Sequence, residues 1–147
     1  MVDAFQNSMA TTLIRAIRGG TAADNEGRLR LIVPASALAV DTTVTIVSAP
    51  VAPTGSSIVH AAWRIVVHPG PTVLSLPASL SVALPAGASA DLRLLAAEQA
   101  VSLGGDWRAL PAALAGQWLA AQVWHLPPSH GPPPVRSSML ICLAAGS

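Results

Sequence analysis

Thirteen prolines are spread along this chain of 147 residues, and they restrict its fold more than any other feature. Proline inside a helix removes a backbone hydrogen bond and clashes with the preceding turn, so most of the chain cannot be helical. Prolines also interrupt the longest uncharged stretches, Ile65–Ala90 and Ala109–Val135. Neither stretch is therefore the unbroken apolar run that a transmembrane helix requires. The prolines argue against a helical bundle and favour short strands joined by turns.

Apolar residues alternate with other residues from position 29 onward. In Leu29–Val33 the apolar positions alternate with Arg30 and Ile32, and the same spacing recurs in Trp63–His68 and Leu80–Leu84. Clusters of Pro, Gly, Ser and Asp separate these runs, which is typical of a sandwich or a barrel. The sequence therefore predicts an all-β fold, an antiparallel β-sandwich.

The first residues of the chain follow a different period. Over residues 2–18 apolar side chains recur at steps of three and four, and Gly19–Gly20 supplies a stop, which predicts a short N-terminal amphipathic helix. This helix either packs on its own domain or acts as an arm that docks on a partner or a membrane surface. The apolar residues of its docking face are Val2, Phe5, Met9, Leu13 and Ile17.

The end of the chain is rich in proline. Pro127–Pro134 predicts an extended, semi-rigid connector, and Ser138–Leu143 is a candidate for a last strand. We therefore expect a helical arm over residues 1–18, a sandwich over 19–126 and a proline-rich C-terminal extension over 127–147. Cys142, the single cysteine, is expected to be a buried small residue, with an intermolecular disulfide or a lipidated thiol as alternatives.

Four marks occur in order between residues 19 and 125. They are Gly19–Gly20 with the strand that ends at Pro34, Pro34–Leu38 with Asp41–Ile46, Trp63–Gly70 with Leu76–Val82, and Gly105–Leu110 with His125. In this order they resemble the ZU5 or ZU5-like domain of ankyrins, netrin receptors and bacterial multidomain proteins. The resemblance implies a β-sandwich. Ser36 departs from the family pattern, which usually has glycine there.

Some proteins of this family cleave themselves at a His-Phe-Ser motif, with serine as the nucleophile. The matching residues here are His125, Leu126 and Pro127, so no hydroxyl group follows the histidine and we expect no self-cleavage. The four histidines also lack the spacing of metal ligands. The sequence predicts no catalytic, cofactor-binding or metal-binding residues, and we expect that the chain is not an enzyme.

Charged side chains are scarce in this sequence. They make up 10% of the residues, against roughly 25% in a typical soluble domain. All eight basic residues are arginine, and a net charge of +1 provides no basic field for nucleic acid. A surface with so few charges leaves apolar area exposed unless a partner covers it. We therefore expect a structural or accessory subunit that docks on the other proteins of a larger, membrane-associated complex, for example an energy-transducing one.

The expected interface includes the N-terminal helix and two tryptophans of the last long strand. Its further candidates are Trp118, Trp124, Pro132, Pro133, Leu140 and Ile141. The chain shows neither a secretory signal nor a transmembrane helix, so we expect a cytoplasmic protein, with peripheral membrane contact as a further option. The alternative hypothesis is a ligand-binding module that takes a carbohydrate or a peptide on a tryptophan-bearing sheet face.

Overall fold

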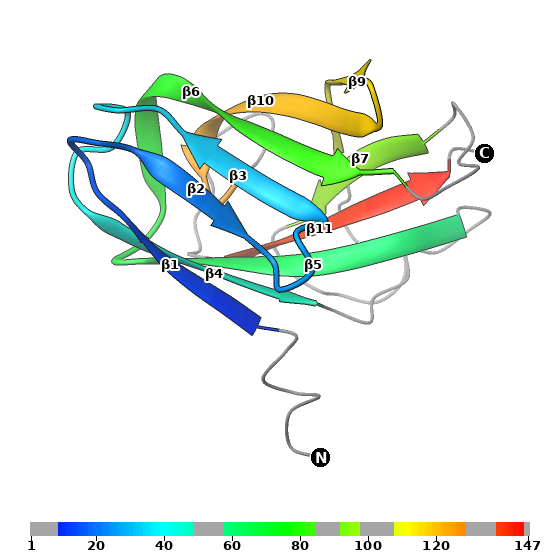
Figure 1. Cartoon of the computed structure of the whole chain (residues 1–147), viewed down its shortest axis with the longest axis horizontal. Coiled ribbons are helices and arrows are strands. Elements are labelled where there is room, and N and C mark those ends of the chain that lie inside the picture. The colour runs from blue at the N-terminus through cyan, green and yellow to red at the C-terminus, as the bar shows by residue number, and fades with distance from the viewer. Residues whose placement is uncertain (1–8, 49–57, 85–91, 98–107, 129–137, 146–147) are drawn as a thin grey trace, which may run out of the picture.

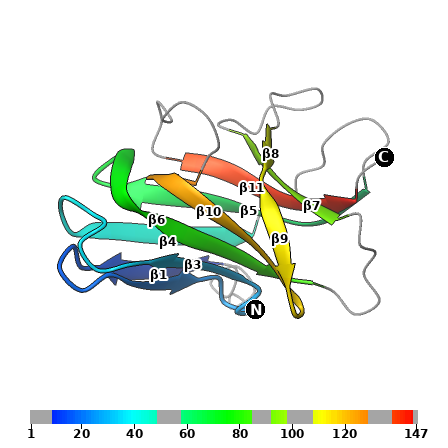
Figure 2. The same cartoon turned by 90° about the horizontal axis from the view of Figure 1, so that it is seen from above.

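The structure is a computed structural model that describes residues 9–48, 58–84, 92–97, 108–128 and 138–145. All regular elements in these residues are β-strands, and they form two antiparallel sheets that lie face to face (Figures 1 and 2). The six-stranded sheet has the order β1 (Met9–Ile14), β4 (Thr42–Ser48), β5 (Ile58–His68), β11 (Ser138–Ala145), β7 (Leu92–Ala97) and β8 (Arg108–Leu110). The five-stranded sheet has the order β2 (Gly20–Ala23), β3 (Leu29–Val33), β6 (Thr72–Ala83), β10 (Trp118–Leu126) and β9 (Ala112–Ala115). The predicted all-β, antiparallel two-sheet fold is confirmed.

The core lies between the sheets and follows the alternation in the sequence. In β3, Leu29, Leu31 and Val33 point inward and are buried. Arg30 and Ile32 lie between them and point outward, because successive side chains of a strand face opposite sides. A shift of the strand by one residue would expose the whole apolar set, at about 1.5–3 kcal/mol for each large side chain. The alternation therefore fixes the register of this strand.

The predicted N-terminal helix is wrong for the residues that the structure describes. Met9–Ile14 is a strand, β1, which pairs with β4 from Met9 opposite Val47 to Ile14 opposite Thr42. Three of its six residues, Thr11, Thr12 and Ile14, are β-branched, and this favours extended backbone. The edge of β4 supplies hydrogen-bond partners, and Ile14 is buried in the core. Residues 2–8 of the predicted helix lie outside the described residues.

The C-terminal segment is part of the sandwich and not a separate extension. Ser138–Ala145 forms β11, which lies between β5 and β7 inside the six-stranded sheet. Its side chains are buried on both faces: Ile141 belongs to the core between the sheets, whereas Leu140 and Cys142 point the other way and are also fully buried. An uncharged apolar run is typical of a strand with two buried faces. The sandwich therefore extends beyond both boundaries of the expected domain, residues 19 and 126.

The chain crosses from one sheet to the other between consecutive short strands, and it does so at both sides of the sandwich. β1 is followed by β2 in the other sheet, and only Pro111 separates β8 from β9. In the first crossing, the N–H group of Gly19 donates to the carbonyl oxygen of Arg15 over 2.8 Å, and Gly19 has a φ of 70°. A β-carbon on Gly19 would overlap the carbonyl oxygen of Val33 and lie 2.6 Å from the carbonyl carbon of Pro34. Glycine is needed here for both its conformation and its size.

The two requirements at Gly19 can be separated by comparison with Gly27. Gly27 has nearly the same φ, 71°, but a β-carbon there would meet nothing within 4 Å. We expect Gly27→Ala to lower the free energy of unfolding by about 1 kcal/mol, the cost of left-handed backbone. Gly19→Ala adds a clash with backbone and should cost about 3 kcal/mol or more. Chemical denaturation of both variants measures the difference, and equal costs would contradict the close approach at Gly19.

Candidate functional site

The structure places the predicted interface residues in different parts of the sandwich. Leu13 is exposed on β1, and Ile17 is exposed in the turn that follows it. Trp118 is half-buried at the start of β10, and Trp124 is half-exposed near its end. Met9 is the first residue of β1. The other candidates of the terminal segments lie outside the described residues: Val2, Phe5, Pro132 and Pro133.

Leu140 and Ile141 do not lie on a surface, contrary to expectation. Both side chains are fully buried, and β11 is paired on both of its edges. Neither side chain can contact a partner while the sheet is intact. The physical reason is that the segment pairs with β5 and β7, which the apolar run alone does not reveal.

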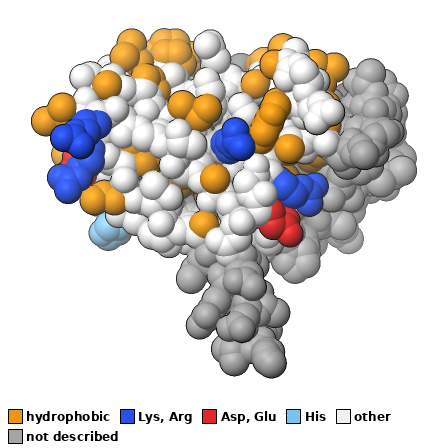
Figure 3. Space-filling view, viewed as in Figure 1, with side chains coloured by type: hydrophobic (Ala, Val, Ile, Leu, Met, Phe, Trp, Pro, Cys, Tyr) orange, Lys and Arg blue, Asp and Glu red, His pale blue; other side chains and the backbone are white. Residues whose placement is uncertain are grey.

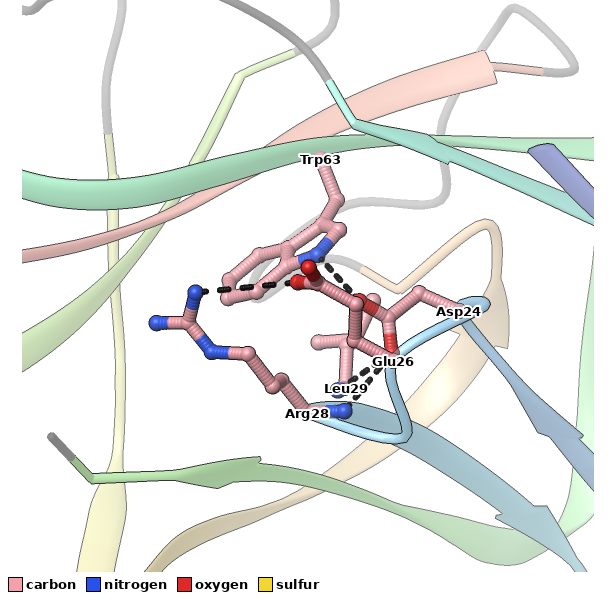
Figure 4. A network of polar contacts seen from close by, with 5 residues as sticks. All are labelled: Asp24, Glu26, Arg28, Leu29 and Trp63. Carbon is pink, nitrogen blue, oxygen red and sulfur yellow. Dashed lines mark hydrogen bonds and ion pairs between the residues drawn. The ribbon is translucent and has the colours of Figure 1, made fainter. Parts of the chain in front are cut away.

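A buried polar network joins the two sheets (Figure 4). Asp24, at the end of β2, is almost fully buried, and its Oδ1 atom accepts hydrogen bonds from the N–H groups of Arg28 at 2.7 Å and Leu29 at 3.1 Å. Its Oδ2 atom accepts a hydrogen bond of 3.0 Å from the indole Nε1 of Trp63, a buried residue of β5. The carboxylate therefore closes the β2–β3 turn within one sheet and binds a side chain of the other.

Exposed charges complete this network at its outer side. The guanidinium of Arg28 lies 6.0 Å from the centroid of the Trp63 ring and 3.9 Å from a carboxylate oxygen of Glu26. Both partners of this ion pair are partly exposed, so its contribution to stability is small. The bond from Asp24 to Trp63 has no signal in the sequence. This network is structural.

The bond between the sheets can be tested with a double-mutant cycle. In Asp24→Asn the side chain keeps one carbonyl oxygen, so one of the three N–H donors loses its acceptor. We expect the free energy of unfolding to fall by about 1–3 kcal/mol. In a Trp63→Phe background the indole N–H is absent, and the same substitution should cost less. Chemical denaturation of the four proteins gives the coupling energy, and a coupling of zero would show that the two side chains do not interact.

The thiol of Cys142 is buried in the middle of the six-stranded sheet. Burial raises the pKa of the Cys142 thiol from its ordinary value of 9.0 to about 12. The thiol therefore stays protonated at neutral pH, where a nucleophile or a metal ligand must be a thiolate. A disulfide to a partner or a lipid on Cys142 would require this part of the sheet to open.

Alkaline pH should destabilise the protein through Cys142. Because the folded pKa is raised, the unfolded chain loses the thiol proton from about pH 9 upward while the folded chain keeps it. The free energy of unfolding should therefore fall by up to about 1.4 kcal/mol per pH unit as the pH rises from 9 toward 12. The chain contains neither lysine nor tyrosine, so no other side-chain type titrates in that window. Denaturation at several pH values measures this slope, and Cys142→Ala should remove it; an unchanged slope would contradict the assignment.

The outer face of the five-stranded sheet carries one tryptophan and one arginine. The guanidinium of Arg30 on β3 lies 4.4 Å from the centroid of the Trp118 ring on β10. The pair reaches across β6, where the small side chains of Ser81 and Ala83 lie opposite them in register. Trp118 is therefore the tryptophan on an outer sheet face that the ligand-binding hypothesis requires.

A second surface lies at one end of the sandwich, which we call the loop end. It consists of the connections Arg15–Gly19 and Pro34–Asp41, the turn 68–71, and the adjoining ends of β6 and β10, which lie together at the left of Figures 1 and 2. Hydrogen bonds join these segments: the N–H of Ser36 donates to the carbonyl oxygen of Ala16, and that of Ser75 donates to the carbonyl oxygen of Ala37.

The loop end combines exposed apolar side chains with arginine. Arg15, Ile17, Arg18 and Asp41 line a hollow of about 430 Å³, and Arg15 and Asp41 form an ion pair of 3.5 Å. Figure 3 shows basic side chains beside apolar ones at this end. The exposed apolar residues at or next to this end are Leu13, Ile17, Val40, Val73, Leu76 and Trp124. The sequence predicted Leu13, Ile17 and Trp124, but it gave no sign that the fold would bring the others to the same end.

The strand β9 is a third candidate surface. It forms the margin of the five-stranded sheet, and among the described strands it pairs with β10 alone (Figure 2). All four of its residues, Ala112–Ala115, are exposed. The sequence did not single out this strand, because alanine-rich segments indicate neither a strand nor a surface.

Comparison of the chain with models of known protein families, and with curated proteins, gives no match. The ZU5 resemblance therefore remains a prediction. Ser36, in the connection between β3 and β4, has a φ of 68°, a conformation that favours glycine. Among the described residues, no group of three or more His, Cys, Asp or Glu side chains is arranged to hold a metal ion. The described part of the chain contains no helix of the length and apolarity needed to cross a membrane.

Proposed function

We propose that this chain is a non-enzymatic docking subunit that holds an extended segment of a partner protein at the free edge of β9. The observation that supports this proposal is the composition and exposure of β9 in the described part of the chain. The four residues of β9 are exposed and contain neither a charge nor a proline. Natural edge strands usually carry such residues, which prevent pairing with another chain. An edge without them is suited to a strand that pairs in an assembly.

The orientation of Leu114 supports the same proposal. Leu114 lies opposite Leu119 in register, so both side chains point to the inner face of the sheet. Leu119 is buried, but Leu114 is 56% exposed. A partner strand beside β9 would continue the sheet by one strand, and its inward side chains would cover Leu114. Backbone hydrogen bonds would then supply affinity, and the side-chain contacts would supply specificity.

The edges at the other side of the sandwich are less suited to a partner strand. β1 and β2 are the marginal strands there, and they contact each other across the two sheets. Each edge thus has a neighbour from its own chain. β9 lies at the opposite margin, and in the sequence it falls within the uncharged stretch that runs from Ala109 to Val135. These features favour β9 as the contact by which the chain joins a larger assembly.

A second candidate function is ligand binding on the outer face of the five-stranded sheet. The position of Trp118, half-buried on an outer face of small side chains, favours it. Sugars and other planar or apolar ligands stack on such rings. However, the guanidinium of Arg30 already lies over the Trp118 ring, so a stacking ligand would have to displace it or bind beside it. We therefore place this function second.

The docking proposal can be tested with Leu114→Lys. An inward-pointing lysine on an edge strand blocks pairing with another strand, because the charge would be buried in the extended sheet. We expect the wild-type chain, isolated under native conditions from its own cells, to carry a stoichiometric protein partner, and the variant to lose at least about 90% of it. Native mass spectrometry measures the stoichiometry.

Val40→Lys is the matched control for this experiment. Val40 is 55% exposed, nearly the same as Leu114, but it lies in the loop before β4. It should keep the partner. If the isolated wild-type chain is a stable monomer without a stoichiometric partner, or if both lysine variants lose it equally, the proposal is wrong.

A further inference from the structure

At the loop end, a turn fixed by backbone hydrogen bonds holds the side chain of Ile17 in solvent. Ile17 is 83% exposed, although it follows a residue that is fixed on two sides. The N–H of Ala16 donates to Oδ1 of Asp41 over 2.8 Å, and its carbonyl oxygen accepts from the N–H of Ser36 over 2.9 Å. The bond from Gly19 to Arg15 closes the turn. The exposure of Ile17 is therefore built into the fold.

The charge around Ile17 is positive. Arg15 and Arg18 flank it, and Asp41 is the acidic residue that lines the same hollow. Asp41 accepts from the Ala16 N–H with one oxygen and pairs with Arg15 through the other, so its capacity is used within the turn. Within the described part of the chain, Arg18 forms no ion pair. The two arginines outnumber the one carboxylate of this hollow, and together with the guanidinium of Arg18 this local charge suits an anionic partner.

The other exposed apolar groups of the loop end are of the kind that enter a lipid interface. Val40 and Val73 are more than half exposed, and they belong to a different connection and a different strand end. Trp124 is 50% exposed at the irregularity in register between β10 and β6. Tryptophan is enriched at the level of lipid headgroups, where its ring is half in apolar surroundings. Protruding aliphatic tips, a tryptophan and arginines together match a membrane surface better than a flat protein face.

We propose that the loop end docks on a membrane that contains anionic lipids. In this arrangement Ile17 inserts below the headgroups, and Arg15 and Arg18 bind lipid phosphates at the surface. Val40, in the loop before β4, and Trp124, near the end of β10, lie at the interface. The inference goes beyond the proposed partner strand and does not depend on it, because β9 lies at a margin of the sheet and shares no residue with the loop end.

The test is sedimentation of the whole purified chain with lipid vesicles. We expect binding to vesicles of phosphatidylcholine that contain phosphatidylglycerol, and much weaker binding to phosphatidylcholine alone or at high salt. The double variant Arg15→Gln/Arg18→Gln should bind about 30-fold more weakly, at about 1 kcal/mol for each arginine. Ile17→Ser should bind about tenfold more weakly, because it loses the insertion of an aliphatic side chain. All these side chains are exposed, so the variants should fold normally.

Matched variants away from the loop end locate the surface. Arg30→Gln removes an exposed arginine and Leu114→Ser an exposed leucine, and both should bind vesicles like the wild type. Brominated lipids should quench the tryptophan fluorescence of the wild type. The quenching should be weaker in Trp124→Phe, because that variant lacks the tryptophan at the membrane interface. The proposal is overturned if the wild type does not sediment with anionic vesicles, if it binds both vesicles equally, or if the control variants lose as much binding as the loop-end variants. Such a failure leaves the β9 edge untouched, because that edge is tested by protein capture.

Discussion

The carboxylate of Asp24 is the polar group on which the arrangement of the two sheets depends most. It ends β2, accepts both N–H groups at the start of β3, and binds the indole of Trp63 in the opposite sheet. A buried carboxylate is costly unless each oxygen is hydrogen-bonded, and here both oxygens are. Two of the three hydrogen bonds hold the β2–β3 turn, and the third ties that turn to Trp63 in a fixed direction. The network therefore fixes the position of the β2–β3 hairpin relative to β5.

The sequence predicted the architecture because its strongest signals are local. The alternation in Leu29–Val33 requires one buried face, and the same alternation recurs in Trp63–His68 and Leu80–Leu84. The predictions from the sequence were wrong where pairing with another strand decides the structure of a segment. Met9–Ile14 has apolar residues at helical spacing, but β4 offers it an edge, and the resulting hydrogen bonds outweigh the weak helix preference. The pattern of one segment shows its own preference for helix or strand. It does not show whether another strand offers an unpaired edge to that segment in the folded protein.

The candidate surfaces were harder to predict than the fold for a related reason. A surface joins residues that are distant in sequence, such as Ile17, Val40 and Trp124, and their proximity follows from the order of the strands. None of these residues differs in type from those of the core. What distinguishes them is exposure, and exposure is a property of the tertiary structure. The composition indicated only that apolar area would remain at the surface, not where.

The position of β11 changes the meaning of that composition. A strand with two buried faces uses apolar residues on both, so Leu140 and Cys142 raise the apolar content of the chain without exposing any of it. Burial on both faces of β11 thus explains part of the scarcity of charge. High apolar content alone is therefore weaker evidence for docking than the sequence suggests. The evidence that remains is local: an uncharged edge at β9 and an isoleucine held outward between two arginines. These features have no role in the core. Each of them exposes an apolar side chain at a position where the fold would accept a polar residue.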